Sequence, residues 1–287
     1  MHIFAFTYKL NLIVILVNTY ILFYAVRFFI PYNKKIIFNR LYKFIYKTTE
    51  PVLKLFGKKE VSEEKKKKDT RALYVILIFI ALYWILFSID NPSKPFLFGL
   101  IYMISSFVTY FFYLFSFMFI ADFFILMRGP HSYGEFARII HFSSNSIIRY
   151  FRKMFPKLSK LKRDYTPFIG LGAVIILSSL SMTILSGLLG DAVSFMENIG
   201  RALQSLVNMF AFIWIALIII RVVFSWFRSG KKTLFYENII FLTEPILSPL
   251  RTYIPPYKTG IDFTPLAAII IILLVKKISF FLINLIF

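Results

Sequence analysis

Arg27, Asp122 and Arg221 are charged residues that each lie inside a long apolar stretch of this chain. An ionisable side chain in such a stretch is costly, and it marks by default an ion pathway, a proton relay or a buried pair. Asp122 is the candidate for ion or proton handling, because a carboxylate can bind a cation or exchange a proton. The structural alternative, which we favour, is an ion pair with Arg128, or with Arg27 or Arg221 from a neighbouring segment.

A glutamate follows each of the two arginines after the same interval. Glu50 comes 23 positions after Arg27, and Glu244 comes 23 positions after Arg221. Because the two residue types recur together, we predict that each arginine pairs with the glutamate of its own segment. The alternative is that both arginine side chains extend to the lipid headgroups.

Each glutamate belongs to a Thr-Glu-Pro sequence, at positions 49–51 and 243–245. Proline disfavours the helical conformation in the residue before it. We therefore predict a sharp bend at Pro51 and at Pro245, where one amphipathic helix ends and another begins.

Two Asp-x-Thr-Pro sequences, at 164–167 and 262–265, have the pattern of a helix start. The threonine is predicted to cap the helix, and the proline to occupy the first helical position. Asp164 and Asp262 then lie near the positive end of each helix dipole, which favours an anion. The functional alternative is that the two aspartates bind a cation at the cytoplasmic mouth of a pathway.

The same residue types recur at fixed offsets, which indicates internal repeats. An offset of 194 positions superposes Arg27 on Arg221 and residues 49–51 on 243–245. An offset of 99 superposes Arg152 on Arg251, and one position of slippage then superposes the two Asp-x-Thr-Pro sequences. We predict three tandem units: residues 1–95, 96–190 and 191–287, with a Lys- and Glu-rich insertion at 57–71 in the first.

The middle unit departs from the other two at its charged positions. Asp122 takes the place of Arg221, and Asn145-Ser146 takes the place of Glu244-Pro245. Across the three units, the candidates for a structural or functional role are Arg27, Glu50, Pro51, Asp122, Asp164, Pro167, Arg221, Thr243, Glu244, Pro245, Arg251, Pro255, Asp262 and Pro265.

The elements that must position these residues are membrane helices. Apolar residues make up 59% of the 287 positions. Six stretches approach the roughly 20 apolar residues that a membrane helix needs. They are 10–30, 72–89, 96–127, 166–190, 203–226 and 263–287, of which the last is interrupted by Lys276 and Lys277. We predict an all-α polytopic transmembrane bundle, in which about six spans form three parallel helical hairpins.

The connections between the predicted spans alternate between strongly basic and weakly charged. Residues 31–71 contain thirteen Lys or Arg and five acids, 128–165 contain nine and two, and 227–261 contain five and two. The positive-inside rule places these three connections in the cytoplasm and both termini outside, which we expect to be across a bacterial inner membrane. Each connection has the pattern of a helix lying in the lipid interface. The third, at 234–250, is apolar enough to form a re-entrant turn instead.

No enzyme signature is present. His2, His131 and His141 do not have the spacing of a metal site, no glycine-rich phosphate loop occurs, and no base accompanies the serines of 177–187. Close helix packing is the predicted role of those serines and of three glycines: Gly170, Gly172 and Gly187.

Charge and composition limit the partners. The formal net charge is +20, but the basic run at 58–69 carries no nucleic-acid motif or aromatic platform, so we expect no nucleic-acid partner. The chain contains no cysteine, which excludes disulfides and thiol catalysis. We expect no cofactor and no metal. The expected partners are membrane lipids with anionic headgroups, attracted to the basic face, and a protein partner or a second copy of the chain.

Several of these motifs resemble the YggT family of small bacterial and plastid membrane proteins, also called YlmG. The resemblance rests on IRVVFSW at 220–226, LTEPILSPLR at 242–251, IPP at 254–256 and GIDFTP at 260–265. It covers the last unit fully. The first unit keeps only the arginine and Thr-Glu-Pro, and the middle unit keeps only Arg-x-x-x-Pro and Asp-x-Thr-Pro.

The resemblance implies an integral membrane protein linked to osmotic-stress tolerance, ion uptake, cell division or envelope organisation, and in plastids to nucleoid partitioning or cofactor assembly. Family members typically have one or two units and no agreed biochemical activity. We expect a non-enzymatic protein that acts in one of these processes through lipid or partner binding at its basic cytoplasmic face. The alternative is a cation channel or transporter whose pathway is lined by Asp122, Asp164 and Asp262.

Overall fold

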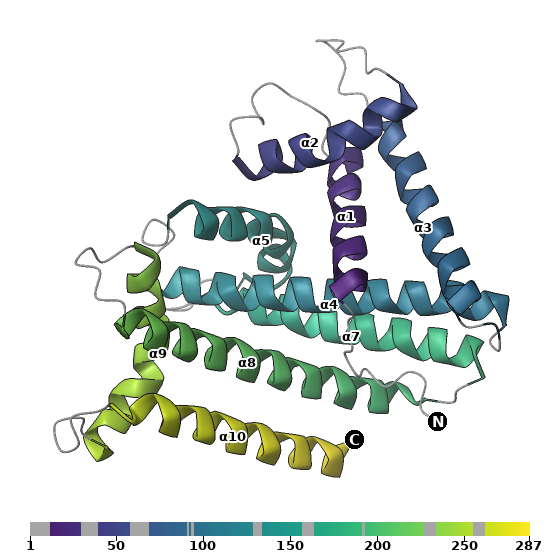
Figure 1. Cartoon of the computed structure of the whole chain (residues 1–287). Helices are drawn as coiled ribbons and strands as arrows, with labels where there is room; N and C mark the ends of the chain where they lie inside the picture. Colours follow the sequence, from purple (N-terminus) through teal and green to yellow (C-terminus); the bar gives the residue numbers. More distant parts are fainter. Residues whose placement is uncertain are drawn as a thin grey trace. The chain divides into compact units, whose positions relative to one another are not determined.

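The computed structural model describes ten parts of the chain: residues 12–29, 40–57, 69–90, 92, 95–128, 134–156, 164–190, 193–226, 234–254 and 262–287. Every regular element in these parts is helical, which confirms the all-α prediction for them. The elements, shown in Figure 1, are α1 (Leu12–Phe29), α2 (Arg40–Leu53), the short 3-10 helix η2 (Lys54–Phe56), α3 (Thr70–Asp90), α4 (Phe96–Arg128), α5 (Gly134–Met154), α7 (Thr166–Leu188), α8 (Phe195–Trp226), α9 (Leu234–Tyr253) and α10 (Thr264–Ile286).

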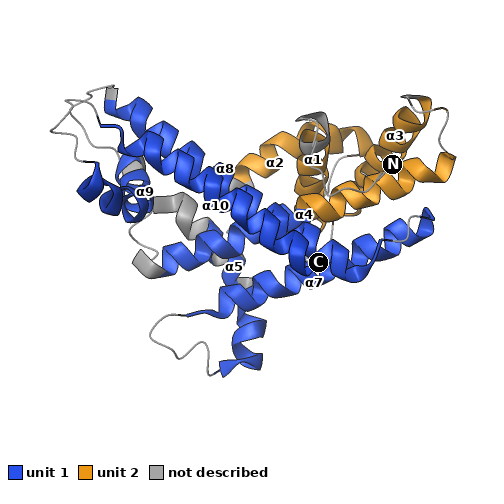
Figure 2. Ribbon diagram, turned by 90° about the horizontal axis from the view of Figure 1, so that it is seen from below, with its two compact units in different colours: residues 1–6, 111–287 blue, residues 7–110 orange. Residues whose placement is uncertain are grey.

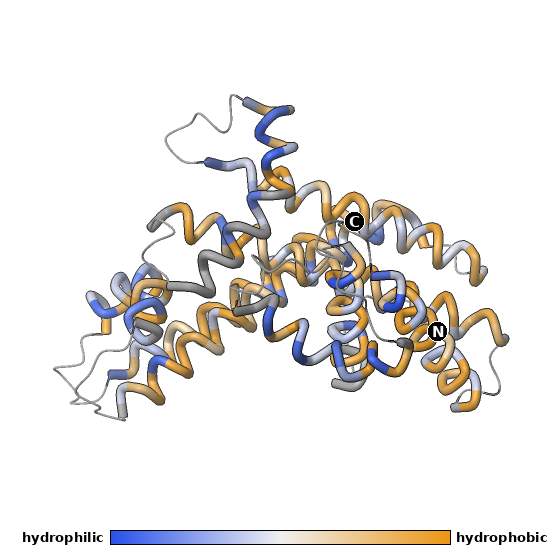
Figure 3. Tube along the Cα trace, turned by 90° about the horizontal axis from the view of Figure 1, so that it is seen from above, coloured by the Kyte–Doolittle hydropathy of each residue, from blue (hydrophilic) through white to orange (hydrophobic). Residues whose placement is uncertain are grey.

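Five of these helices are long and apolar enough to cross a membrane: α3, α4, α7, α8 and α10. The first predicted span is a shorter apolar helix, Leu16–Phe28, within α1. The last runs without a break through Lys276 and Lys277. Figure 3 shows apolar residues dominating the long helices. By length and composition, the structure fits an integral membrane protein.

Helix α8 starts at Phe195, well before the start predicted at residue 203. The hydroxyl of Ser194 accepts a hydrogen bond from the backbone N–H of Glu197 at 3.1 Å, and the Glu197 carboxylate pairs with Arg201 one turn later. Ser-x-x-Glu is a helix-start signal in sequence. That signal was present at 194–197, and the sequence analysis missed it.

The chain divides into two compact units, residues 7–110 and residues 1–6 with 111–287 (Figure 2). In the first of these, α1 packs against α3, and α2 contacts both of them. Its core contains Tyr24 from α1, Leu53 from α2, and Ala72 and Val75 from α3. The ring of Tyr24 stacks on that of Phe79 with 6.1 Å between centroids. Helix α2, which connects α1 to α3, is therefore part of the core of this unit through Leu53.

The larger unit has the same kind of packing around α8. This helix contacts α7, α9 and α10, and α9 also contacts α10 (Figure 1). One core cluster joins Phe112, Ala202 and Leu206, and a second joins Ile218 of α8, Leu247 of α9 and Ala268 of α10. Helix α9 therefore packs against both α8 and α10, which also pack against each other.

Close packing at glycine occurs at only one of the three predicted positions. A Cβ added at Gly170 of α7 meets the ring of Phe119 of α4 at 3.0 Å. At Gly172 and Gly187 an added Cβ has no neighbour within 4 Å, so the prediction was wrong for these two. The reason is that both glycines lie on faces of α7 that no described element covers. Three of the serines bond to carbonyls of their own helix instead of a neighbour: Ser178, Ser181 and Ser186.

Alanine substitutions at Gly170 and Gly172 are expected to differ in their effect on stability. Either alanine favours the helix by up to about 1 kcal/mol. At Gly170 the methyl group must displace the Phe119 ring, and overpacking of this kind costs about 1–3 kcal/mol. Gly170→Ala should therefore be less stable than Gly172→Ala by that amount in denaturant titrations of the detergent-solubilised protein. Equal stabilities would show that Phe119 moves aside freely.

Candidate functional site: three elbow clusters

Each connecting helix holds a group of polar side chains against the long helices around it. The first elbow cluster comprises Arg27, Thr49, Glu50, Asp69 and Arg71. The middle elbow cluster comprises Asp122, His141, Ser144, Asn145, Arg152 and Asp164. The third elbow cluster comprises Arg221, Thr243, Glu244, Arg251 and Asp262.

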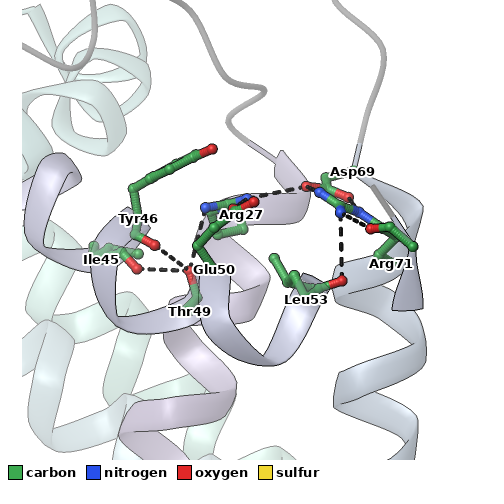
Figure 4. A network of polar contacts seen from close by, with 9 residues as sticks. Arg27, Ile45, Tyr46, Thr49, Glu50, Leu53, Asp69 and Arg71 are labelled. Carbon is green, nitrogen blue, oxygen red and sulfur yellow. Dashed lines mark hydrogen bonds and ion pairs between the residues drawn. The ribbon is translucent and has the colours of Figure 1, made fainter. Parts of the chain in front are cut away.

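The first elbow cluster is built on Arg27 in the last turn of α1, whose side chain is almost fully buried. Its Nη2 lies 2.8 Å from Glu50 Oε2 and 3.3 Å from Asp69 Oδ2, and its Nη1 donates to Thr49 Oγ1 at 3.4 Å (Figure 4). The guanidinium carbon lies 4.2 Å from the ring centroid of Tyr46, a cation–π distance. The predicted pair between Arg27 and Glu50 is confirmed.

Arg71, at the start of α3, completes this cluster. Its Nε donates to Asp69 Oδ1 at 3.0 Å and its Nη1 to the carbonyl oxygen of Gly57 at 2.6 Å. The two arginines balance Glu50 and Asp69 in charge, and they tie the end of η2 to the start of α3. Sequence reasoning missed Asp69 and Arg71 because it assigned both to a solvated insertion. Their position directly before the apolar run at 72–89 was the available signal.

The third elbow cluster repeats the arrangement 194 positions later. Arg221 Nη2 lies 2.7 Å from Glu244 Oε2, and Nη1 donates to Thr243 Oγ1 at 2.7 Å. Arg251 then bridges two carboxylates, with Glu244 Oε1 at 2.9 Å and Asp262 Oδ2 at 3.6 Å. The predicted pair of Arg221 with Glu244 is confirmed. This cluster is more open to solvent than the first, since the Glu244 side chain is 41% exposed.

The bends predicted at the Thr-Glu-Pro sequences were wrong. Pro51 lies inside α2, and Pro245 and Pro249 lie inside α9. An interior proline costs about 3 kcal/mol or more. The arginine bonds to the threonine and glutamate just before it offset this cost and hold that turn helical. Helix α9 is continuous from Leu234 to Tyr253, so the alternative of a re-entrant turn within this segment is not formed.

In the middle elbow cluster the central charge is reversed. Asp122 is fully buried. Its Oδ1 lies 2.7 Å from His141 Nδ1, and its Oδ2 accepts a hydrogen bond from Ser144 Oγ at 3.0 Å. Of the predicted arginine partners, Arg27 and Arg221 bind their own glutamates instead. The side chain of Arg128 lies outside the described residues, so its pairing with Asp122 stays a prediction. Sequence analysis missed His141 and Ser144, although Ser144 matches Thr243 at the offset of 99.

The rest of the middle cluster follows the pattern of the third. Arg152 donates to the Asn145 side chain and, through Nε, to Asp164 Oδ2 at 2.8 Å. Arg251 bridges Glu244 and Asp262 in the equivalent way, 99 positions later. The offset of 99 matches Arg152 with Arg251, but the match alone did not predict that each arginine forms an ion pair with an aspartate.

Both Asp-x-Thr-Pro sequences start a helix as predicted, but by a different contact. Helices α7 and α10 begin at Thr166 and Thr264, with Pro167 and Pro265 in the first turn. The cap is the aspartate: Asp164 Oδ1 accepts the Thr166 N–H at 2.9 Å, and Asp262 Oδ1 accepts the Thr264 N–H at 3.0 Å. The predicted capping by threonine was wrong, because each threonine is already inside its helix. Pro255 lies outside the described residues.

The two capping aspartates are held in their charged form. Burial alone raises the pKa of Asp164, but hydrogen bonds from Thr166 and Arg152 outweigh it and lower this pKa below its usual value. The pKa of Asp262 is lowered in the same way, with burial opposed by the bonds from Thr264 and by the charge of Arg251. Both carboxylates are thus occupied by donors from the protein.

A lowered folded-state pKa makes the contribution of Asp164 depend on pH. The stabilisation is fully present above the unfolded pKa of about 3.9 and is lost as pH falls through the folded pKa. Asp164→Asn keeps an oxygen that can accept the Thr166 N–H but removes the charge paired with Arg152, so it should reduce the unfolding free energy at pH 7 by about 0.2–1 kcal/mol. Thermal unfolding of both proteins between pH 7 and pH 3 should show this gap closing at the acid end. A gap that stays constant with pH would contradict the assignment.

The hydroxyl in each cluster accommodates either sign of charge. Thr49 and Thr243 accept from an arginine and donate to a carbonyl oxygen one turn earlier, each at 2.7 Å. Ser144 instead donates to Asp122. A hydroxyl can do both because it carries one donor and two acceptor positions. In the described part of the chain, no group of three or more His, Asp or Glu is placed to hold a metal ion. What the geometry provides is a mechanical connection between helices.

Comparison with protein families gives one match. Residues 200–283 match the CCB3/YggT family model. The matched stretch contains the whole third elbow cluster. A search of curated proteins found no match, and neither did a search of solved structures. The match supports the resemblance for the last part of the chain.

Proposed function

We propose that this YggT-type membrane protein consists of three tandem units whose elbow helices bind anionic lipid at the cytoplasmic face of a bacterial inner membrane. Its role is non-enzymatic and lies in envelope organisation, cell division or osmotic-stress tolerance. The equivalent contacts at offsets of 99 and 194 support three units. The family match and the five apolar helices support a membrane location.

The observation that carries the proposal is that the basic residues on and around α2 are of two kinds, those paired with carboxylates and those exposed without a partner. Arg27 and Arg71 are engaged with carboxylates in the first elbow cluster. Lys43, Lys47 and Lys54 are exposed on α2 and η2, and none of them forms an ion pair in the described part of the chain. The lysines are therefore free to interact with groups outside the protein.

Exposed apolar side chains lie on the same elements as these lysines. Phe44 is 58% exposed and Leu55 is 81% exposed. A helix that presents both basic and apolar side chains is suited to the boundary between headgroups and acyl chains. The first elbow cluster fixes the orientation of α2 and so presents this surface in one direction.

Helix α5 presents a similar surface at its end. Arg149 and Lys153 are exposed, and Tyr150 and Met154 beside them are about 70% exposed. Helix α9 differs, because its Arg251 belongs to the third elbow cluster and its exposed residues are mainly uncharged. The lipid-binding proposal therefore rests mainly on α2 and α5.

The test measures binding of phosphatidylglycerol to the detergent-released protein by native mass spectrometry. The triple variant Lys43→Gln, Lys47→Gln, Lys54→Gln should bind this lipid at least about tenfold more weakly, since each basic residue contributes roughly 1 kcal/mol near an anionic surface. The matched control replaces the same lysines by arginine and should bind like the wild type. The wild type and both variants should bind phosphatidylcholine, which has no net charge, equally. Equal binding of phosphatidylglycerol by all three would refute the proposal.

The second candidate function, cation conduction, has less support in the geometry. Each of the three aspartates proposed to line a pathway is bound by protein donors: Asp122 by His141 and Ser144, Asp164 by Thr166 and Arg152, and Asp262 by Thr264 and Arg251. Cation flux into vesicles containing the reconstituted protein, altered by Asp122→Asn, would favour conduction over the lipid-binding role.

A further inference from the structure

Two lysines lie in the middle of the most exposed of the apolar helices. Lys276 and Lys277 are the thirteenth and fourteenth of the 23 residues of α10. Only 6% of the apolar stretch of α10 is buried inside the structure, less than for the other four candidate spans. Charged side chains at this depth are rare and usually paired, because hydrocarbon does not solvate them.

The two lysines are in different surroundings. Lys276 is half-buried, and its ammonium nitrogen lies 5.6 Å from the ring centroid of Phe280, one turn away. Lys277 is exposed, and no hydrogen bond, ion pair or ring contact involves it in the described part of the chain. The part of the chain that the structure describes thus provides no negative charge to compensate Lys277.

The surroundings of Lys277 are apolar and uncovered. Leu273, Leu274 and Phe281, one turn before and after it, are all exposed. Within its unit α10 packs against α8 and α9, and the exposure of these three side chains shows that neither helix covers this face. Lys277 lies about 13 Å from the end of α10 at 1.5 Å per residue. Extension to the headgroups serves lysines near helix ends and does not explain one at this position.

We infer that this face of α10 binds a membrane-spanning helix of another protein that carries an aspartate or glutamate near its middle. A carboxylate at that depth complements Lys277 in charge, and the exposed leucines and Phe281 provide the apolar contact around it. This interaction surface goes beyond the proposed lipid-binding role, which depends on α2 and α5.

A second copy of the chain does not offer the complementary charge. In the five candidate spans the acidic residues are Asp122 and Glu197. Asp122 is fully buried and bound by His141 and Ser144, and Glu197 lies in the first turn of α8 and pairs with Arg201. A carboxylate that meets Lys277 at mid-span must therefore come from a different protein.

The test uses synthetic peptides as the probe in vesicles of phosphatidylcholine. Each peptide is a leucine-rich membrane-spanning helix with a central Asp, Asn or Leu and carries an acceptor dye. The full-length protein carries a donor dye at Leu188→Cys, which is a unique label because the chain has no other cysteine. Energy transfer should show the Asp peptide associating at least tenfold more strongly than the Leu peptide, with the Asn peptide close to Leu.

Variants of the two lysines make the test specific. Lys277→Met should remove the preference for the Asp peptide, and Lys277→Arg should keep it. Lys276→Met removes the same charge at the neighbouring, half-buried position and should weaken association less than threefold. Equal association of the Asp and Leu peptides, or an Asp preference that survives Lys277→Met, would overturn the inference. Self-association of the labelled protein that depends on Lys277 would overturn it too, because it would make a second copy the occupant.

Discussion

Replacing Arg27 by glutamine is expected to lower the free energy of unfolding by about 3 kcal/mol or more. Removing one partner of a buried ion pair leaves an uncompensated buried charge, which typically costs 3–5 kcal/mol. Here the substitution removes the partner of Glu50 and one partner of Asp69, whose side chain is only 3% exposed. Denaturant titration of the detergent-solubilised protein measures the loss. An effect within about 0.5 kcal/mol, as at an ordinary surface site, would contradict this account.

The matched control is Arg221→Gln in the third elbow cluster. Arg221 contacts the equivalent threonine and glutamate, while the aspartate of this cluster is bound by Arg251. Glu244 is also more exposed than Glu50 and keeps Arg251 as a second partner. We expect a smaller loss, about 1–3 kcal/mol, the usual value of hydrogen bonds to a charged group. A larger loss for Arg27→Gln than for Arg221→Gln would show that burial increases the contribution of the arginine–glutamate pair to the free energy of unfolding.

Reversing the charge at Asp122 is the second substitution with a large expected effect. Asp122→Arg brings a guanidinium into a fully buried site whose neighbours, His141 and Ser144, offer it no carboxylate. The expected loss is again about 3 kcal/mol or more, because the buried charge has no partner. Unfolding of the purified variant in the same titration measures it.

A second substitution should recover much of that loss. Adding Asn145→Glu to Asp122→Arg reproduces the residue types of the third elbow cluster, where Arg221 binds Glu244. Asn145→Glu alone should be tolerated, since Arg152 already contacts residue 145. Recovery of at least half of the loss in the double variant is expected. Simple additivity of the two single effects would argue against equivalence of the middle and third clusters.

The sequence predicted those features that depend on spacing within one segment. The Arg27–Glu50 and Arg221–Glu244 pairs were found because a shared interval implies a shared geometry, and the long helices were found because apolar runs identify them. The helix through Pro51 and Pro245 was not found. Local preference argued for a break there, and a contact with a residue 23 positions away decided the outcome.

The middle cluster was harder to predict for a different reason. His141 matches an isoleucine, Ile240, at the offset of 99, so the repeat gave no indication that it binds Asp122. The aspartate caps at Asp164 and Asp262 were close to the predicted arrangement but displaced by two residues. Which oxygen accepts an N–H depends on backbone geometry at the first turn, and residue types alone do not determine that geometry.

The hydroxyl group in each elbow cluster accepts a hydrogen bond from an arginine in the first and third clusters and donates one to an aspartate in the middle cluster. This versatility bears on how tandem copies can diverge. If the three units arose by duplication, as we propose, residue 122 could differ in charge from its counterparts while position 144 kept a hydroxyl, as Ser144 in place of threonine. With an aspartate at 122, position 145 no longer needs a carboxylate, and it is an asparagine where the third unit has Glu244. A serine or threonine at this point is compatible with either sign of charge on the long helix, so one copy can differ in electrostatic character from the other two while its connecting helix is still held in place.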